Sequence, residues 1–385
     1  MNQVKTLRQA IDGEARRLGF HLIGVTTPDP PPHFPTFLSW VDAGYHGQME
    51  YLNHERSRQR RADPGLILPE CRSILVLGMP YWTSHPQIDF SGEDKGRVSA
   101  YAWGDDYHDV FKQRLQVLVS FIEGQVGHVV QHRWYTDTGP LLERDLAQRA
   151  GLGWIGKNTC LINPHQGSFF LLAEILMDLE LEPDLPFESD HCGNCTRCLD
   201  ACPTGCILPE RVIDSRRCIS YLTIELKGEI PPDLRSLMGD WVFGCDICQQ
   251  VCPWNLRFSP LTGDSAFIPR TAIPAPNLRH ELGLSQDEFS RKFKESPIKR
   301  ARRRGYLRNI AVALGNRRDP DALDDLLAAL VGDPEPLVRG HCAWALGDIG
   351  GQKAHTALEQ TLEKETDPHV LQEIRWALIA CKKED

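Results

Sequence analysis

Eight cysteines in this chain follow two related patterns whose spacing suits iron–sulfur clusters. The first run is complete and ends in proline: Cys192, Cys195, Cys198, Cys202 and Pro203. The second repeats it without the first cysteine: Cys245, Cys248, Cys252 and Pro253. In a C-x2-C-x2-C-x3-C-P run, three thiolates bind one [4Fe–4S] cluster and the fourth binds a different cluster. Cys218 lies between the two runs and can supply the missing thiolate.

The crossing of the fourth cysteine predicts two ligand sets. One cluster would be held by Cys192, Cys195, Cys198 and Cys252, and the other by Cys202, Cys218, Cys245 and Cys248. Zinc sites and disulfides are the alternatives, but a zinc site built from two C-x2-C pairs leaves both copies of C-x3-C-P unexplained. The sequence therefore predicts two [4Fe–4S] clusters and a protein that transfers single electrons.

A second segment with possible chemistry surrounds Asp137. Residues 136–140 read Thr-Asp-Thr-Gly-Pro and join a predicted strand to a predicted helix, a junction at which α/β proteins often present catalytic side chains. Gly151, Gly153 and Gly156 predict a loop in which the backbone can approach a large ligand. They are not a dinucleotide motif, because they follow a helix and not a strand. Asp137 is a candidate catalytic residue, and the alternative is that it only caps the next helix.

Positive charge is concentrated in one segment of an otherwise acidic chain. The net charge is −9, yet nine Lys or Arg and a single acid, Glu295, lie between Arg291 and Arg308. The densest part is residues 299–304. Such a basic strip is typical of a contact with a polyanion, and the alternative is a solvated helix start. A helical repeat that begins directly after the strip favours the polyanion.

The composition is that of a soluble globular protein, with 41% hydrophobic and 25% charged residues. The apolar stretches 73–79 and 169–177 are shorter than the ~18 residues of a membrane helix and predict buried strands. Arg16 and Arg17 are not followed by the apolar segment of an export signal. The other cysteines show no framework spacing: Cys71, Cys160, Cys206, Cys342 and Cys381. We expect a cytoplasmic protein.

Hydrophobic spacing predicts a helix from Val4 to Leu18, a strand at 20–25, and a second helix and strand between 110 and 135. Near the C terminus, Ala-x-Ala-Leu-Gly at 311–315 recurs 32 residues later at 343–347 and again in part at 376–378. This period is typical of HEAT-like helix pairs. The predicted organisation is an α/β domain (1–180), a ferredoxin-like two-cluster module (181–260), a linker with the basic strip (261–304) and HEAT-like repeats (305–385).

Taken in order, these motifs resemble the epoxyqueuosine reductase family over essentially the whole chain. The resemblance is carried by residues 136–140, Gly-Trp-Ile-Gly-Lys-Asn-Thr at 153–159, the paired cysteine runs, and the segments 218–225 and 241–248. It implies a cobalamin between the N-terminal domain and the cluster module, and a tRNA substrate with epoxyqueuosine in its anticodon loop. It also implies that an external donor feeds electrons through the clusters, and that epoxide C–O cleavage leaves an alkene and water.

The resemblance also implies roles for individual residues. Asp137 would be the general acid, which must hold its proton near neutral pH in a largely dry pocket. The implied corrin contacts are Arg61, Tyr101, Asp137, Lys157, Asn158, Ser168 and Ser220. The histidine motif Asp-x-His-x-x-Gly is only half matched at 106–111, so no side chain is expected on cobalt. Cys206 stands where the family usually has alanine and is not expected to be a ligand.

Two other classes of protein fit part of the sequence. A reductive dehalogenase shares the cobalamin and the two clusters, but such enzymes typically carry a true export signal and need no basic strip before a helical repeat. A non-enzymatic ferredoxin subunit leaves the N-terminal domain and the segment around Asp137 without a purpose. A HEAT-like tail with an exposed groove is compatible with a monomer.

Overall fold

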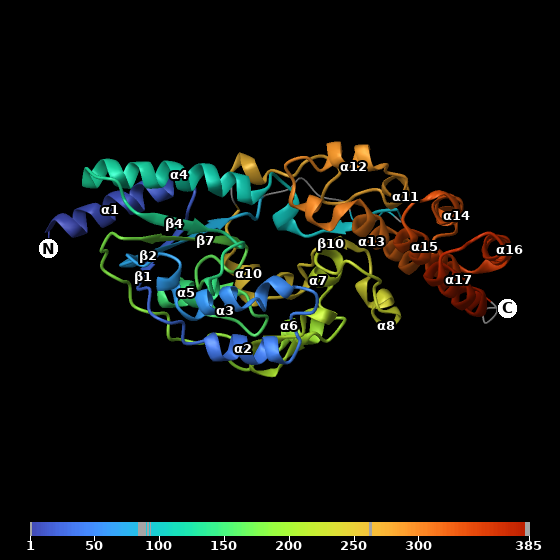
Figure 1. The fold of residues 1–385 in the computed structure, drawn as a ribbon, viewed down its shortest axis with the longest axis horizontal. Helices are drawn as coiled ribbons and strands as arrows, with labels where there is room; N and C mark the ends of the chain where they lie inside the picture. The colour runs from blue at the N-terminus through green and yellow to red at the C-terminus, as the bar shows by residue number, and fades with distance from the viewer. Residues whose placement is uncertain (1, 84–89, 91, 93, 262–263, 382–385) are drawn as a thin grey trace. The chain divides into compact units, whose positions relative to one another are not determined.

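The computed structural model describes residues 2–83, 90, 92, 94–261 and 264–381 and contains two compact units. Unit 1 comprises Met1–Ser84, Asp105–Ser215 and Ile247–Ile268, and unit 2 comprises His85–Gly104, Arg216–Asp246 and Pro269–Asp385 (Figure 1). Each unit is therefore assembled from separate stretches of the chain and draws on more than one of the predicted segments. No helix in the described part of the chain is long and apolar enough to cross a membrane.

Unit 1 is built on a four-stranded sheet in which all neighbouring strands are antiparallel. Its strands, in spatial order, are β1 (Leu22–Thr26), β2 (Ser73–Pro80), β7 (Phe170–Met177) and β4 (His132–Tyr135). All eight residues of β2 are buried, because this strand has a neighbour on each side and packing on both faces. The two apolar stretches are thus confirmed as buried strands.

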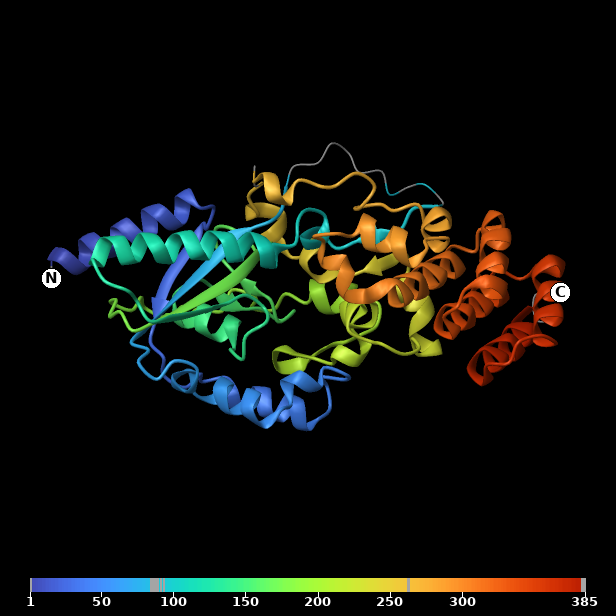
Figure 2. The same cartoon turned by 45° about the horizontal axis from the view of Figure 1, so that its top comes forward.

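Helices cover both faces of this sheet. Helices α1 (Asn2–Arg17) and α4 (Tyr107–Val126) lie together along one face, and α5 (Glu143–Arg149) packs on the other against β1, β2 and β7 (Figures 1 and 2). The Asp106 side chain accepts the His108 N–H at the start of α4, and Gly127 ends the helix in the left-handed conformation. The predicted alternation of helix and strand in this region is confirmed.

The remaining elements of unit 1 are short. Two precede β2: α2 (Phe34–Asp42) and α3 (Glu55–Ala62). Two small hairpins are formed by β5 (Trp154–Ile155) with β6 (Leu161–Ile162) and by β8 (Ile207–Leu208) with β9 (Val212–Ile213). The cysteine runs contribute α6 (Arg197–Ala201), α9 (Ile247–Gln250) and α10 (Pro253–Phe258).

Unit 2 is mainly helical. Its only described strands, β3 (Arg97–Val98) and β10 (Trp241–Phe243), pair in parallel. The helices before the repeats are α7 (Ile219–Ile224), α8 (Pro232–Arg235), α11 (Leu278–Leu282) and α12 (Gln286–Lys292). The repeats consist of α13 (Arg302–Arg317), α14 (Leu323–Gly332), α15 (Pro336–Ile349), α16 (Gly351–Leu362) and α17 (Pro368–Cys381).

The recurring glycines explain how the repeats stack. Helix α15 packs between α13 and α17. A Cβ on Gly315 would lie 2.6 Å from the Trp344 ring, and one on Gly347 would lie 2.7 Å from the Cα of Ala377. Each glycine therefore permits the next helix of the stack to approach closely, which is the reason for its recurrence at the repeat period.

The basic strip is not uniformly exposed, so its interpretation as one phosphate-binding surface is corrected. Arg303 is buried and pairs through its guanidinium with Asp333, while its Nε donates to the Leu284 carbonyl. Arg308 is fully buried, and Arg300 pairs with Glu225 at 2.7 Å. Only part of the strip, including Lys299 and Arg302, is exposed.

We expect Arg303→Gln to lower the stability of unit 2, because removing one partner of a buried ion pair leaves Asp333 uncompensated. Losses of this kind are about 3–5 kcal/mol. The matched variant Arg302→Gln changes an exposed neighbour and should alter stability by less than about 0.5 kcal/mol. Urea unfolding followed by circular dichroism compares the two, and equal midpoints would contradict the assigned role of Arg303.

Candidate active site

Asp137 lies in the loop between β4 and α5 and has a left-handed backbone, with φ of 59°. Its carboxylate accepts a hydrogen bond from the Tyr107 hydroxyl at 2.7 Å, and the Nε2 atom of His108 lies 4.0 Å from the same oxygen. Helix α5 starts only at Glu143, with Leu142 as its N-cap residue. Asp137 is therefore not a helix cap. Its side chain is 69% exposed and is available to a ligand.

Two residues hold the loop that carries Asp137. The backbone N–H of Asp137 donates to the Glu143 carboxylate at 2.6 Å. The buried Arg61 of α3 donates to the Gly139 carbonyl at 3.3 Å and to the Ser57 hydroxyl. Desolvation, together with the negative charge of Asp137, raises the pKa of Glu143 to about 8. Glu143 therefore carries a proton at neutral pH.

A third carboxyl group lies deeper, on the central strand β7. Glu174 is fully buried, and neither of its carboxyl oxygens has a hydrogen-bond partner among the described residues. Burial, followed by the charges of Glu143 and Asp137, raises the pKa of Glu174 well above its ordinary value. Sequence reasoning assigned no role to Tyr107, Glu143 or Glu174. The one available signal was a lone acid within the apolar stretch 169–177.

The predicted corrin contacts of unit 1 differ in how they are used. Lys157 donates to the Gly193 and Cys195 carbonyls at 2.6 and 3.1 Å. Asn158 is buried, and its amide reaches the Cys248 carbonyl at 3.5 Å. The structure thus brings Lys157 and Asn158 to the cysteine runs.

Ser168 is buried and is held within unit 1. Its hydroxyl accepts from the Asn255 amide at 2.9 Å and from the Gln249 amide at 3.0 Å. Tyr101 and Ser220 belong to unit 2, where the Tyr101 ring lies 6.2 Å from that of Phe243 and the Ser220 carbonyl accepts from the Thr223 hydroxyl.

The nearby glycines serve the chain itself. Gly153 has φ of 155°, and a Cβ there would lie 2.1 Å from the Ile162 carbonyl oxygen across the β5–β6 hairpin. Gly151 follows α5 with φ of 76° and approaches the Leu185 carbonyl equally closely. These glycines therefore allow close packing of backbone on backbone, which corrects their interpretation as a ligand-approach loop.

Four of the predicted cluster ligands line one pocket of about 250 Å³ in unit 1: Cys192, Cys195, Cys198 and Cys252. Burial and the charges of the other three thiols raise the pKa of Cys198 to about 11. In the described residues no three metal-binding side chains converge on a point that suits a single ion. Four thiols around a pocket of this size fit a multi-atom cluster, which would also relieve the repulsion between thiolates.

The other predicted set is distributed over both units. Cys202 and Cys248 belong to unit 1, and Cys218 and Cys245 belong to unit 2. Cys206 is buried, and its sulfur lies 3.4 Å from the sulfur of Cys202. The contact with Cys206 is the main cause that lowers the pKa of Cys202 to about 5.

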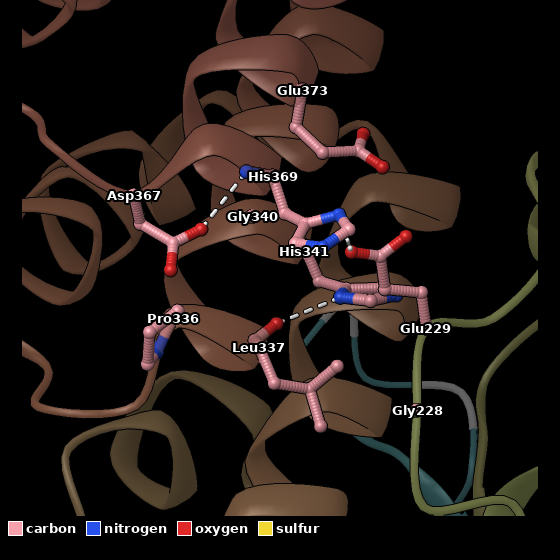
Figure 3. A pocket seen from close by; sticks show the side chains of 9 residues that line it. All are labelled: Gly228, Glu229, Pro336, Leu337, Gly340, His341, Asp367, His369 and Glu373. Carbon is pink, nitrogen blue, oxygen red and sulfur yellow. Dashed lines mark hydrogen bonds and ion pairs between the residues drawn. The ribbon is translucent and has the colours of Figure 1, made fainter.

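A further pocket of about 200 Å³ lies in unit 2 between the loop at Gly228 and Glu229 and helices α15 and α17 (Figure 3). None of the predicted site residues lines it. Its buried His341 accepts the Ile230 N–H at Nε2, so the proton sits on Nδ1 and bonds to the Leu337 carbonyl. Burial lowers the pKa of His341. The neutral ring is a structural link between α15 and that loop.

Comparison with known proteins places this arrangement. The family model of a 4Fe-4S double cluster binding domain matches residues 191–255, and that of HEAT repeats matches residues 300–379. The fold and cysteine pattern thus define a double-cluster iron–sulfur protein with a C-terminal helical repeat. The model described as Epoxyqueuosine reductase QueG, DUF1730, matches residues 61–138.

Full-length relatives are more specific. The epoxyqueuosine reductases of Pseudomonas aeruginosa and Escherichia coli are 41% and 40% identical to this chain over 342 residues, which is 88% of this chain and 94% and 89% of theirs. A crystal structure of epoxyqueuosine reductase with a tRNA-Tyr epoxyqueuosine-modified stem loop superposes with a TM-score of 0.92 and 33% identity. The match covers 98% of this chain and 100% of that one. The chain belongs to the epoxyqueuosine reductase family.

Iron content tests the predicted ligand sets. We expect Cys252→Ala and Cys218→Ala each to lose one cluster's worth of iron, because an alanine leaves one iron atom without its thiolate. Cys206→Ala should keep the wild-type iron content, since Cys206 belongs to neither run. Iron assays and visible absorbance after anaerobic reconstitution measure the result. Loss of iron in Cys206→Ala but not in Cys218→Ala would make the assignment wrong.

Proposed function

We propose that this protein reduces epoxyqueuosine to queuosine in the anticodon loop of tRNA, the last step of queuosine synthesis. The observation that carries the proposal is about 40% identity to epoxyqueuosine reductases over 88% of the chain, together with Asp137 presented on a held, exposed loop. The net reaction consumes two electrons and two protons: both epoxide C–O bonds break, an alkene forms, and the oxygen leaves as water.

Cobalamin, when bound, would deliver to the epoxide the electrons that two [4Fe–4S] clusters relay from an external donor. The chain's own task is to supply protons. Asp137 is the proposed general acid, which protonates the departing oxygen and so prevents its release as an unstable alkoxide. The Tyr107 hydroxyl fixes the Asp137 carboxyl by donating to one oxygen, and it leaves the other oxygen directed to the substrate.

A corrinoid requires polar groups that the chain does not already use. Asp137 meets this condition through its exposure. Arg61, Asn158 and Ser168 are more than nine-tenths buried and are bonded to protein atoms. We therefore propose that these three hold the loops that border the cofactor and do not themselves supply its main polar contacts. No side chain is proposed as a cobalt ligand.

The tRNA contact is proposed for a cluster of cations in unit 2 that includes Lys227, Arg300, Arg302 and Arg304. Burial lowers the pKa of Lys227, and the positive charges of Arg300 and Arg302 lower it further. Cations that repel one another in this way are stabilised by an added polyanion. A solved epoxyqueuosine reductase holds a modified tRNA stem loop, which supports a nucleic-acid partner here.

The remaining partners follow from the same chemistry. Cluster thiolates are damaged in oxidising compartments, so we propose that the protein works in the cytoplasm with a low-potential reductase or flavodoxin-type protein as its donor. We propose that a monomer suffices, because the proposed acid and the cations that bind tRNA come from one chain.

Substitution of Asp137 tests the proposed acid. Asp137→Asn should retain tRNA affinity yet lose about 10²- to 10⁴-fold in turnover, since the amide cannot donate an acidic proton. Tyr107→Phe, which keeps the acid and removes only its positioning bond, should lose less. Anaerobic assays with epoxyqueuosine-containing tRNA and nucleoside analysis give both rates, and near-normal turnover in Asp137→Asn would refute the role.

The salt dependence of tRNA binding tests the exposed cations. Each phosphate contact with single-stranded nucleic acid contributes about 0.7 to the salt slope, so the double variant Lys299→Gln/Arg302→Gln should flatten that slope by up to about 1.4. Lys353→Gln/Lys364→Gln, which removes two cations from and just after α16, is the control and should bind like wild type. Equal slopes for both double variants would place the tRNA contact elsewhere.

A further inference from the structure

Three carboxyl groups lie in succession from the exposed loop to the interior of the sheet. Asp137 is at the surface, Glu143 bonds to its backbone N–H at 2.6 Å, and Glu174 lies on the central strand β7. The three are close enough for their charges to act on one another: Asp137 acts on Glu143, and both act on Glu174. The register of the sheet places Glu174 directly opposite Tyr135, two residues before Asp137.

Glu174 has no structural explanation among its neighbours. Alternation along β7 directs Phe170, Leu172, Glu174 and Leu176 to the same face, which packs on Leu146 of α5. This surrounding is apolar. A carboxyl group here receives no hydrogen bond from any described residue, so its ionised form is strongly disfavoured. An apolar side chain would fill the same space at lower cost, which points to a use for the proton.

Glu143 connects this interior acid with the loop. The groups that act on Glu143 are Asp137 and, with the opposite sign, Arg144 and Arg61. Arg144 is engaged with the Thr159 carbonyl and Arg61 with Gly139, so neither forms a recorded ion pair with Glu143. With no such pair to hold it ionised, Glu143 can both carry and release a proton.

The proposed reaction sets a requirement that Asp137 alone does not meet. Two protons are consumed for each epoxide, and a single carboxylic acid delivers one. After the first transfer, Asp137 is a carboxylate beneath a bound substrate that blocks its access to water. A second proton must then reach it from the protein side.

We propose that Glu143 and Glu174 form a proton relay that reloads Asp137 within one catalytic cycle. In the relay, protonated Glu143 transfers its proton to the Asp137 carboxylate and becomes a carboxylate itself. Glu174 then transfers its proton to Glu143, and solvent restores Glu174 after product leaves. No electrons move in these steps, and the number of protons is conserved. The inference rests on the proposed function, and both glutamates act through Asp137 and not on the substrate.

Infrared spectroscopy of the protein without substrate or cobalamin tests the first requirement, that both groups hold protons. The carbonyl stretch of a protonated carboxylic acid should be present at pH 7 and should decrease in both Glu174→Gln and Glu143→Gln. The component lost in Glu143→Gln should titrate near pH 8 in the wild type, because the group gives up its proton through that pKa. Glu180→Gln, an exposed acid after β7, is the matched control and should leave the band unchanged.

Turnover tests the second requirement, that these protons are used. Wild-type kcat should fall as pH rises through about 8, where Glu143 becomes ionised. Glu143→Gln should lose about tenfold or more in kcat, less than Asp137→Asn, with an unchanged KM for tRNA and without that pH dependence. Should Glu174→Gln not fold, Glu143→Gln and its pH profile decide alone.

The possible outcomes separate the relay from the proposed function. Wild-type turnover together with unchanged kcat and pH profile in Glu143→Gln overturns the relay alone. Absence of the protonated-acid band in the wild type also overturns the relay. Absence of wild-type turnover with reconstituted clusters, cobalamin and epoxyqueuosine-containing tRNA overturns the proposed function and the relay with it.

Discussion

The hydrogen bond from the Asp137 backbone to Glu143 is the contact on which the candidate active site depends. A non-glycine residue in the left-handed conformation costs roughly 1–2 kcal/mol, and Asp137 adopts it at φ of 59°. The 2.6 Å bond to Glu143 and the bond from Tyr107 offset that cost. Because Glu143 begins α5 and Asp137 follows β4, the same bond also fixes the distance between a strand and the next helix. The position of the acid is therefore a property of the sheet and of α5.

Charge is arranged oppositely in the two units. The acids of unit 1 are close together, and burial keeps at least Glu143 and Glu174 protonated, so the site presents less negative charge than its composition suggests. The cations around Lys227 in unit 2 remain charged and repel one another. A polyanionic substrate is favoured by both arrangements, since it meets positive charge in one unit and reduced repulsion in the other. The net charge of −9 indicates neither arrangement.

The sequence allowed the prediction of whatever depends on local pattern. The buried strands and the repeat glycines follow from spacing alone. The role of Glu174 could not be inferred, because an acid in an apolar strand gains meaning only when the neighbouring loop brings Glu143 to it. Arg303 was misread for the same reason: its partner Asp333 lies 30 residues away, and only packing of α13 beside the α14–α15 turn shows that the charge is buried.

Buried polar contacts also explain why the repeats and part of the cysteine-rich region belong to one unit. From α13, Arg308 donates to the carbonyls of Leu222, Leu226 and Gly228, and Asn309 donates to those of Thr223 and Val242. These acceptors lie on α7, which follows Cys218, on the chain just after it, and on β10, which precedes Cys245. Breaking such bonds would leave buried carbonyls unsatisfied. The helix that follows the basic strip and the segments that carry two predicted cluster ligands are therefore held as one body, and a polyanion bound at the strip acts on that body as a whole.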